Sequence, residues 1–511
     1  MARTASTFGS AGILAAGGTA ALLADLAGSA GASATIVVDS SADGTADANH
    51  CTDGTPGNCT IRDAAAADGD IITFDAAITN ITLTEGEIGT QAVSIVGPGS
   101  SALTITTAGV PGAYDMFRIG GTGDALISGL TLTKNRIKSL NTEKFTLDDV
   151  AITGSTGNYG GALYAGNDDL EIRNSHFEDN CATKNGGAVY IYNGADATIS
   201  DSEFVNNESS REGGAIFSDD AQDITLIDSE ITGNVAGERG GGLNFGEGVL
   251  GDVSIVGCTF DSNHTQEYGG AAEFGQGLDI VVSNTTVSNN SAVGGAGLNF
   301  DSDNITATIN NSTITANAAV KGGGGIYINE NASLTINQST VSANSAGGTT
   351  LGYGGGGIAI GSDTTVVTMS GTIVSGNTSA VDGEADISLY SENTGDVGSF
   401  SSANSIIGEF DSRLTHTSTD DVLSTDPMLG ELADNGGATK TMALLSGSPA
   451  IDAGPNPVTA FVGNEFDQRG PGFIRIVDGR VDIAAFEVQA DTGPTTTSTA
   501  AGQPVVPAFT G

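Results

Sequence analysis

Tryptophan is absent from this chain, cysteine occurs four times, and lysine and arginine together number only 17. Against 61 aspartates and glutamates, the shortage of basic residues leaves a formal net charge of −44. Binding to the phosphates of nucleic acid requires a basic patch, so this balance argues against nucleic acid as a partner. Four cysteines are also too few for a fold built on disulfides. The fold must therefore rest on backbone pairing and apolar burial.

Long apolar runs are missing as well, since no stretch of about eighteen apolar residues occurs, and we expect no transmembrane segment apart from an export signal. Arg3 precedes an Ala-rich apolar stretch, and Ala32-Ser33-Ala34 fits the small-residue cleavage pattern. We therefore expect a signal peptide over residues 1–34, although Asp25 interrupts its apolar region. Localisation would be extracellular or at the cell surface. Cys51 and Cys59 flank a Gly/Pro loop and are candidates for a disulfide in that oxidising compartment.

Glycine is abundant, with 76 residues, and it punctuates an internal repeat of about 27 residues. Each repeat contains a Ser or Thr, then any residue, an apolar residue, two further residues and Asn. A glycine pair and alternating apolar residues follow, as in Gly186-Gly187-Ala188-Val189. The asparagines that close the first motif are Asn180, Asn207, Asn234, Asn263, Asn290, Asn317, Asn344 and Asn377.

This period, with apolar residues alternating over short runs, predicts several short strands per repeat rather than helices. One coil cannot bury its apolar face alone, whereas stacked coils bury a continuous core. We therefore predict an all-β chain, a right-handed parallel β-helix (solenoid) with about 27 residues per coil. The asparagine column is expected in tight turns, because Asn tolerates a left-handed backbone. The Ser/Thr column, which includes Cys258, is expected to point inward.

The paired motifs Gly-Gly-Ala-(Ile/Leu/Val) and Phe-x-x-Asn resemble the repeats of chlamydial polymorphic outer-membrane proteins and related bacterial β-helix proteins. Residues 59–74 resemble a CSLREA-type N-terminal segment. Residues 426–454, with Asp467-Gln468-Arg469-Gly470 and residues 482–487, resemble a choice-of-anchor Q domain. The resemblance implies an exported bacterial or archaeal surface protein and no catalytic residues.

These patterns divide the chain into five parts. A signal peptide over residues 1–34 is followed by an N-terminal cap over 35–90 and the β-helix repeats over 91–420. A choice-of-anchor-Q-like C-terminal cap is expected over 421–490, and a Thr/Pro-rich disordered tail over 491–511.

Two functions remain open at this stage. The first is a non-catalytic secreted or surface protein, adhesin-like, glycan-binding or structural in the cell envelope. The alternative is a polysaccharide-degrading lyase or glycoside hydrolase. Arg136-Ile137-Lys138 matches one motif of polygalacturonase-like enzymes, but no histidine lies between glycines to complete the pair of motifs. No catalytic residue is therefore assigned.

Two columns are candidates for binding glycans. If Leu163, Val189 and Ile216 point inward, the residues that follow them point outward. That outward column is Tyr164, Tyr190, Phe217, Asn244, Glu273, Asn299 and Tyr327. Its aromatic members are expected to form an exposed strip that stacks on sugar rings. The basic column lies in the turn before the glycines and consists of Lys184, Arg211, Arg239 and Lys321. These cations either bind the glycan or neutralise nearby glutamates such as Glu212 and Glu238.

A third column carries a carboxylate in the turn after the aromatic strand of each repeat. Its members are Asp168, Asp196, Asp219, Glu247, Asp279, Asp301, Glu330 and Asp363. Oxygen-rich clusters of this kind suit Ca²⁺, so calcium is a possible ligand, with Asp168, Asp196, Asp219, Glu247 and Asp301 as candidates. No cofactor is required by the sequence.

Overall fold

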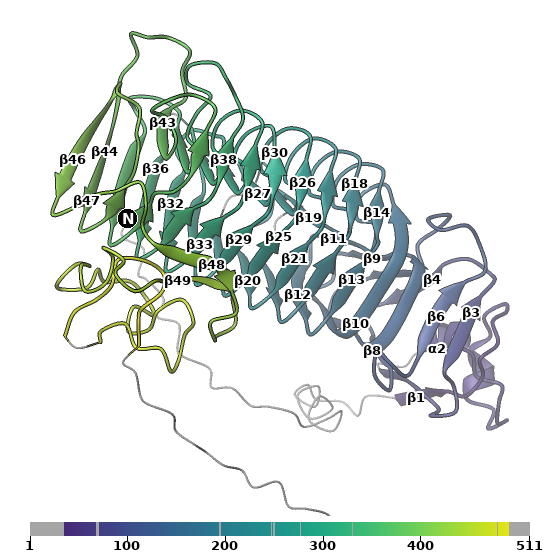
Figure 1. Ribbon diagram of the computed structural model, residues 1–511. Helices are drawn as coiled ribbons and strands as arrows, with labels where there is room; N and C mark the ends of the chain where they lie inside the picture. Colours follow the sequence, from purple (N-terminus) through teal and green to yellow (C-terminus); the bar gives the residue numbers. More distant parts are fainter. Residues whose placement is uncertain are drawn as a thin grey trace, which may run out of the picture.

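The computed structural model describes residues 35–67, 71–193, 196–246, 248, 251–275, 277–329, 331–477 and 479–489. The chain winds into a stack of coils, and equivalent strands of successive coils pair in parallel (Figure 1). Within these described ranges, the strands form sheets of 35, 12 and two strands. We name the first sheet A and the second sheet B. The predicted parallel β-helix with about 27 residues per coil is confirmed.

Sheet A supplies three columns of strands and sheet B supplies one. The first column is β1 (Thr35–Val38), β2 (Ile71–Phe74), β5 (Ser94–Val96), β8 (Ala125–Asn135), β10 (Lys144–Gly157), β12 (Asp169–Arg173), β16 (Ala197–Ser200), β20 (Ile224–Ile227), β24 (Asp252–Val256), β28 (Asp279–Ser283), β32 (Thr306–Asn310), β36 (Ser333–Asn337), β40 (Val366–Ser370), β44 (Gly398–Ala403) and β46 (Leu414–Thr419). The long strands β8 and β10 continue into the second column.

The rest of the second column is β3 (Asn80–Leu83), β6 (Thr104–Thr107), β13 (His176–Glu178), β17 (Glu203–Val205), β21 (Glu230–Thr232), β25 (Thr259–Asp261), β29 (Thr286–Ser288), β33 (Thr313–Thr315), β37 (Thr340–Ser342), β41 (Ile373–Val374), β45 (Ile406–Ile407) and β47 (Val422–Leu423). The third column is β14 (Cys181–Ala182), β18 (Glu208–Ser209), β22 (Val235–Ala236), β26 (His264–Thr265), β30 (Ser291–Ala292), β34 (Ala318–Ala319), β38 (Ser345–Ala346) and β42 (Thr378–Ser379).

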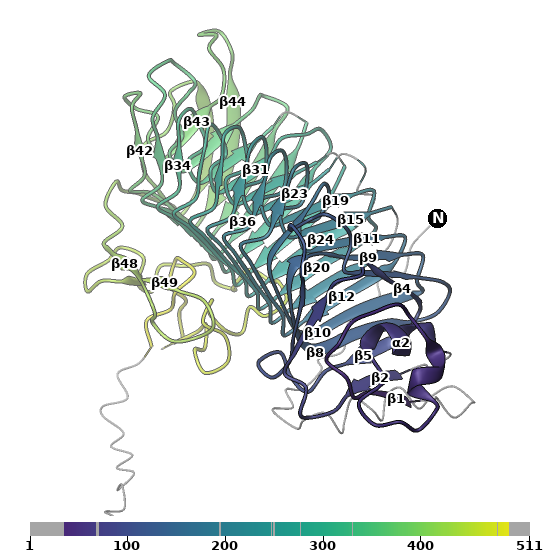
Figure 2. The same cartoon turned by 90° about the vertical axis from the view of Figure 1, so that its right-hand side faces the viewer.

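Sheet B runs along the stack as one parallel row (Figure 2). Its strands are β4 (Ile88–Gln91), β7 (Phe117–Gly120), β9 (Ile137–Leu140), β11 (Leu163–Gly166), β15 (Val189–Tyr192), β19 (Ile216–Asp219), β23 (Leu243–Phe245), β27 (Ala272–Phe274), β31 (Leu298–Phe300), β35 (Ile326–Ile328), β39 (Ile358–Ile360) and β43 (Ile387–Leu389).

The core fills the inside of the stack with apolar ladders. Phe177 and Phe204 are fully buried, and their rings stack with centroids 4.8 Å apart. The Ser/Thr column points inward as predicted, because Ser175, Ser202 and Cys258 are all buried. Each hydroxyl accepts a backbone N–H from the coil before it, as between Ser175 N and Ser202 Oγ at 3.2 Å. Apolar burial and these bonds together set the register between coils.

The asparagine column departs from the prediction. In each turn, the left-handed conformation is adopted by the residue before the closing asparagine, as Asn206 shows with a φ of 53°. The closing asparagines themselves are not left-handed. Instead, Asn207 and Asn234 are fully buried, and Asn207 Nδ2 donates to Asn234 Oδ1 at 3.0 Å. The same side chain also donates to the carbonyl of Phe177. The column is therefore an internal amide ladder that joins the coils.

Glycine pairs let the backbones of neighbouring coils approach closely. Gly186 has a φ of 71°, in the left-handed region that favours glycine. A Cβ on the next residue, Gly187, would collide with the carbonyl oxygen of Gly214 in the following coil. The pair thus provides both the turn and the close approach that stacking demands.

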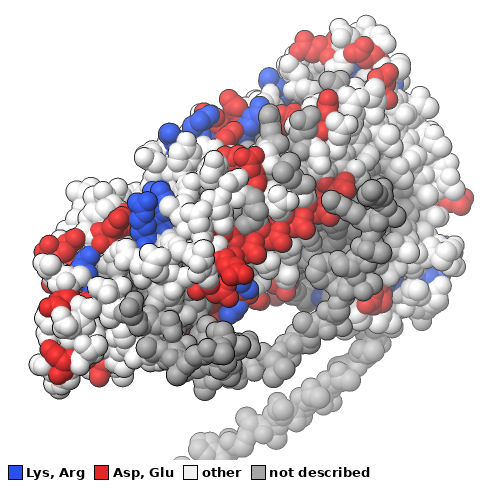
Figure 3. Space-filling view, turned by 180° about the vertical axis from the view of Figure 1, so that it is seen from behind, with Lys and Arg blue, Asp and Glu red and all other residues white. Residues whose placement is uncertain are grey.

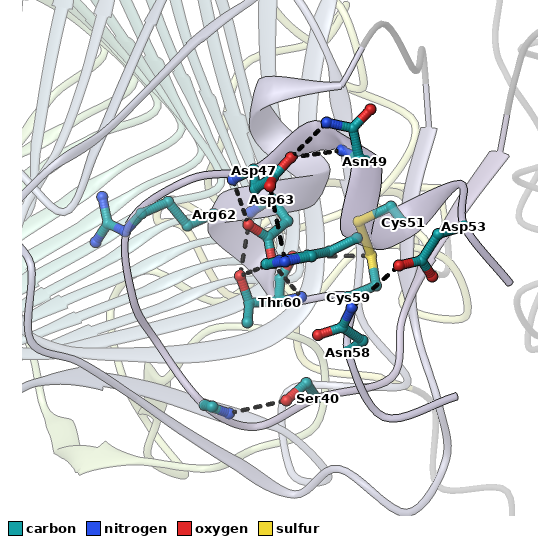
Figure 4. A network of polar contacts seen from close by, with 12 residues as sticks. Ser40, Asp47, Asn49, Cys51, Asp53, Asn58, Cys59, Thr60, Arg62 and Asp63 are labelled. Carbon is teal, nitrogen blue, oxygen red and sulfur yellow. Dashed lines mark hydrogen bonds and ion pairs between the residues drawn. A yellow bond between two sulfur atoms is a disulfide. The ribbon is translucent and has the colours of Figure 1, made fainter. Parts of the chain in front are cut away.

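The N-terminal segment, expected as a cap over 35–90, is continuous with the stack. Its strand β1 already pairs with β2, and the short helix α2 (Ile61–Ala66) and the 3₁₀ helix η2 (Ala48–Cys51) lie at that end. A disulfide joins Cys51 to Cys59 beside a capping box in which Thr60 and Asp63 satisfy each other's backbone N–H groups (Figure 4). Crosslink and cap together hold α2 against the first coil.

The C-terminal segment after β47 lies along the side of the stack (Figures 1 and 2). After β48 (Leu429–Ala433) and β49 (Thr441–Leu444), the chain packs against the second column of sheet A. Gln468 bonds Thr286 and Thr313 at 2.9 and 2.6 Å. Apolar side chains from both partners, including Ile373 and Ile483, form a small core between them.

Several expectations fall outside the described residues, namely the signal peptide over 1–34 and the tail over 491–511. Along the described part of the chain, no helix has the length and apolar character needed to span a membrane.

Candidate functional site

The outward face of sheet B gathers most of the candidate residues, because parallel pairing puts one residue from each coil in register. We call this the sheet B face. Its central column is Gly89, Arg118, Lys138, Tyr164, Tyr190, Phe217, Asn244, Glu273, Asn299, Tyr327, Ala359 and Ser388. The column predicted from the sequence, Tyr164 to Tyr327, is thus placed in one row as expected.

Four tyrosines form what we call the tyrosine patch: Tyr159, Tyr164, Tyr190 and Tyr192. The rings of Tyr164 and Tyr190 stack with centroids 5.3 Å apart, and those of Tyr190 and Tyr192 lie 6.1 Å apart. Tyr159, from the turn before the glycines, leans over the strand with its ring 4.9 Å from that of Tyr190. Sugar rings pack on aromatic faces of this kind through apolar contact.

The exposed aromatic strip expected from the sequence is only partly exposed. Tyr190 and Phe217 each keep 5% of their surface accessible, whereas Tyr192 keeps 38%. The reason is mutual cover, since the Phe217 ring stacks 5.5 Å from that of Tyr190 and Tyr159 lies over the latter. Tyr190 donates its hydroxyl to Asp219 at 2.8 Å, and burial with this bond raises its pKa. Tyr159 and Tyr164, both half-buried, and Tyr192 are therefore the rings that a ligand can reach.

Three cations surround the tyrosine patch. Lys138 Nζ lies 4.9 Å from the centroid of Tyr164, and Lys184 Nζ lies 4.6 Å from that of Tyr159. Arg136 reaches within 6.0 Å of the Tyr164 ring, but it is also ion-paired with Asp115 at 2.6 Å. Stacking a cation over an aromatic ring is favourable and holds both side chains in place.

The basic column predicted from the sequence separates into paired and unpaired members. Arg211 pairs with Glu238 at 3.2 Å, and Arg239 pairs with Glu273 and Asp301 at 3.4 Å each. Of the two roles expected for the basic column, the structure shows that Arg211 and Arg239 neutralise nearby acids. Lys184 instead bonds the hydroxyl of Tyr159 at 3.1 Å.

A second aromatic group lies further along the same face, around Tyr327. Its ring meets Tyr390 edge-on at 5.0 Å, and Tyr353 lies 5.5 Å from Tyr390. Lys321 Nζ lies 5.3 Å from the ring of Tyr353. The sheet B face therefore carries aromatic groups with a lysine at two places along the solenoid.

Between these groups lies an acid pair held by one arginine. Arg239 Nη1 contacts both Glu273 and Asp301, and Asn299 Nδ2 donates to Glu273 at 2.6 Å. Burial raises the pKa of Glu273 to about 8, and the charge of Asp301 adds to the shift. Burial also raises the pKa of Asp301, while Arg239 opposes that shift. Two acids whose pKa is raised by burial thus lie against the same arginine, an arrangement able to transfer protons.

The carboxylates proposed for Ca²⁺ have other partners. Asp168 is buried and accepts the N–H and hydroxyl of Thr142, while Asp219 accepts from Tyr190 and Asp301 from Arg239. Glu247 lies outside the described residues. Among the described side chains, no three His, Cys, Asp or Glu residues gather in a way that would hold a metal ion.

Asp196 belongs instead to a chain of exposed aspartates along sheet A, where each carboxylate accepts the backbone N–H of the next: Asp169, Asp196, Asp223 and Asp252. The described turn carboxylates thus accept hydrogen bonds from neighbouring donors. Carboxylates also gather in a band along one side of the molecule, where few basic side chains lie (Figure 3).

Sequence reasoning missed Arg118, Lys138, Tyr159 and Tyr192 as members of the site. Lys138 lies in the Arg136-Ile137-Lys138 motif, whose sequence signal is that of an enzyme motif. Successive residues of a strand point to opposite faces, so Lys138 points outward in β9 because Ile137 is buried. The alternation that predicted the outward tyrosines therefore also predicts an outward Lys138. Tyr159 carried no such signal, because its position depends on how the turn folds over the strand.

Fold and site thus define the class of this protein: a parallel β-helix with aromatic and charged side chains on one outward face. The chain belongs to the family described as right-handed β-helix region, whose model matches residues 73–244 and 187–379. A search of curated proteins gives no match.

Solved structures that match the chain share little sequence with it. The A-module of mannuronan C-5 epimerase AlgE4 from Azotobacter vinelandii is 14% identical, with 71% of this chain and 91% of that chain covered and a TM-score of 0.33. Pectate lyase Pel9A is 12% identical, with 89% and 97% covered and a TM-score of 0.35. Tailspike protein 3 of bacteriophage CBA120 is 13% identical, with 71% and 56% covered and a TM-score of 0.30. Similarities at this level carry no information on activity.

Proposed function

We propose that this protein is exported and binds polysaccharide at the cell surface through the tyrosine patch, without catalysing a reaction. The observation that carries the proposal is the stack of Tyr164, Tyr190 and Tyr192, in which the outer rings remain accessible. Tyrosine rings offer flat apolar area together with a hydroxyl, the combination that suits a sugar. Because the patch lies on paired strands, its rings are held in place before any ligand arrives.

Export is supported by independent features. The disulfide between Cys51 and Cys59 is typical of oxidising compartments. The net charge of −44 favours solubility outside the cell. The resemblance of the repeats to polymorphic outer-membrane proteins, and of the C-terminal segment to a choice-of-anchor Q domain, fits a surface location.

The test is binding of the purified chain to a panel of soluble polysaccharides by affinity gel electrophoresis. Changing Tyr164 and Tyr192 together to Ala should weaken binding about tenfold or more, since each aromatic contact contributes about 1 kcal/mol beyond its area. The matched control changes the same two residues to Phe, which keeps the rings and should keep the affinity. If the alanine variant retains a wild-type melting curve and undiminished binding, the tyrosine patch is not the site.

A second candidate function is hydrolysis of a glycosidic bond, favoured by the acid pair at Arg239. Two carboxyl groups held by one arginine, both with a pKa raised by burial, suit a general acid and its partner, here Glu273 and Asp301. Release of reducing ends from the polysaccharides that bind would support this function. That activity should disappear in both Glu273→Gln and Asp301→Asn, whereas binding should persist.

A further inference from the structure

Cations near the tyrosine patch lack the partners that most other cations of this protein have. The chain holds 61 acidic residues for 17 basic ones, so an ion pair is easily found. Side chains that form one within 4.0 Å include Arg62, Arg136, Lys144, Arg173, Arg211, Arg239, Arg413 and Arg469. Among the described residues, Arg118, Lys138 and Lys184 have no carboxylate oxygen within that distance. Other described cations, such as Lys134 and Lys440, also form no ion pair, but these three lie together: Lys138 and Lys184 over rings of the tyrosine patch, and Arg118 on the strand next to Lys138.

These three cations follow the axis of the solenoid. Arg118 and Lys138 are register partners on β7 and β9, and the next partners in the row are Tyr164 and Tyr190. Successive coils stack about 4.8 Å apart, so Arg118 and Lys138 are near neighbours of like charge. Like charges facing each other on neighbouring strands destabilise a sheet. The arrangement costs the folded protein stability, as residues that serve a ligand often do.

The surface beside Arg118 is hollowed. A cavity of about 770 Å³ is lined by residues that include Gly89, Arg118, Gly120 and Leu140. Gly89 precedes Arg118 in the outward column, and a Cβ added there would meet nothing within 4 Å. Small residues at this end of the row therefore leave room above the sheet next to an exposed guanidinium group.

The acids close to these cations are already engaged. Asp115 pairs with Arg136, and Asp219 accepts the hydroxyl of Tyr190. An incoming anion would therefore meet positive charge that the protein itself does not neutralise.

We infer that the ligand is an acidic polysaccharide, which lies along the solenoid axis over β7 to β15 with its carboxylate or sulfate groups on Arg118, Lys138 and Lys184. This inference rests on the proposed function, because the sugar rings are those that stack on the tyrosine patch. Arginine binds a carboxylate through two parallel hydrogen bonds, and lysine acts as a compact charge. Repulsion from the negatively charged surface elsewhere would confine such a polymer to the outward column of sheet B.

The experiment compares alginate and polygalacturonate with the same polymers after reduction of their carboxyl groups, using affinity electrophoresis at low salt. Acidic polymers should bind at least tenfold more tightly than their neutral counterparts, and 0.5 M NaCl should remove most of this difference, because salt screens charges over about 10 Å at 0.1 M. Arg118→Gln with Lys138→Gln should weaken binding of the acidic polymers tenfold or more.

Arg211→Gln is the matched control, since Arg211 is exposed and paired with Glu238, and its affinity should remain that of the wild type. Equal binding of acidic and neutral polymers would overturn the inference and leave the proposed glycan-binding function standing. Binding of single-stranded DNA as tight as that of the acidic polymers would also overturn it. If no polymer of either kind binds, the proposed function fails along with the inference.

Discussion

The buried amide ladder leads to a sharp prediction for Asn234. Its Oδ1 accepts the backbone N–H and the side-chain Nδ2 of Asn207 at 2.9 and 3.0 Å. Its Nδ2 donates to the carbonyl of Phe204 and to Asn263 Oδ1, both at 2.9 Å. Because Asn234 has no accessible surface, water does not replace these bonds while the stack is intact. Asn234→Ala therefore removes hydrogen bonds from buried groups on three neighbouring residues, namely Asn207, Phe204 and Asn263.

The magnitude follows from the groups left unpaired. A buried polar group that loses its partner costs about 1–3 kcal/mol. The N–H of Asn207 and the carbonyl of Phe204 lose the Asn234 side chain outright, whereas Asn263 Oδ1 retains the backbone N–H of residue 234. We therefore expect a loss of about 3–5 kcal/mol in the free energy of unfolding for these coils.

Hydrogen exchange measured by mass spectrometry is the suitable assay, because a long solenoid does not unfold as a single two-state unit. Amides of the coils on both sides of Asn234 should exchange at least a hundredfold faster in the variant. The control is Glu230→Ala in β21 of the same coil, where the side chain is exposed and the change should stay within about 0.5 kcal/mol. Similar exchange rates in both variants would refute the reasoning.

Three further predictions concern other parts of the fold. Phe204→Ala should cost about 3–5 kcal/mol, because the ring is fully buried, and a denaturation midpoint equal to that of Glu203→Ala would show the face assignment to be wrong. Changing Cys51 and Cys59 to Ser should destabilise the N-terminal segment by about 2–3 kcal/mol, seen as faster proteolysis there than in the coils. Glu273 binds its proton more tightly when folded, so the stability it contributes is full below its unfolded pKa of 4.5 and is lost as the pH rises towards about 8. Melting temperatures of Glu273→Gln should therefore fall less than those of the wild type between pH 5 and pH 9, and parallel curves would contradict this.

Much of the fold could be read from periodicity. Alternation of apolar and polar residues assigns Phe204 inward and Glu203 outward, and the observed burial agrees. The same parity placed Tyr164 and Tyr190 in one outward row. This alternation does not predict how exposed a side chain is to solvent. A side chain that points outward is still buried when a neighbouring turn folds over it. Tyr159 covers Tyr190 in this way.

The function of the asparagine column shows a second limit. Asn is common both in left-handed turns and in buried amide ladders, so residue type did not separate the two. The backbone decides, since the residue before Asn207 already takes the left-handed conformation. Asn207 is then free to point into the core, where equivalent side chains from adjacent coils meet.

By itself, the sequence determined the coil length and the inward columns, because each depends on neighbours within one repeat. Tertiary structure alone decided which cations remain unpaired, which rings stay accessible and where the C-terminal segment lies. These outcomes depend on contacts between distant parts of the chain, such as the bond between Thr313 and Gln468 across 155 residues. Such contacts are made only after the coils have stacked, and no local pattern records them.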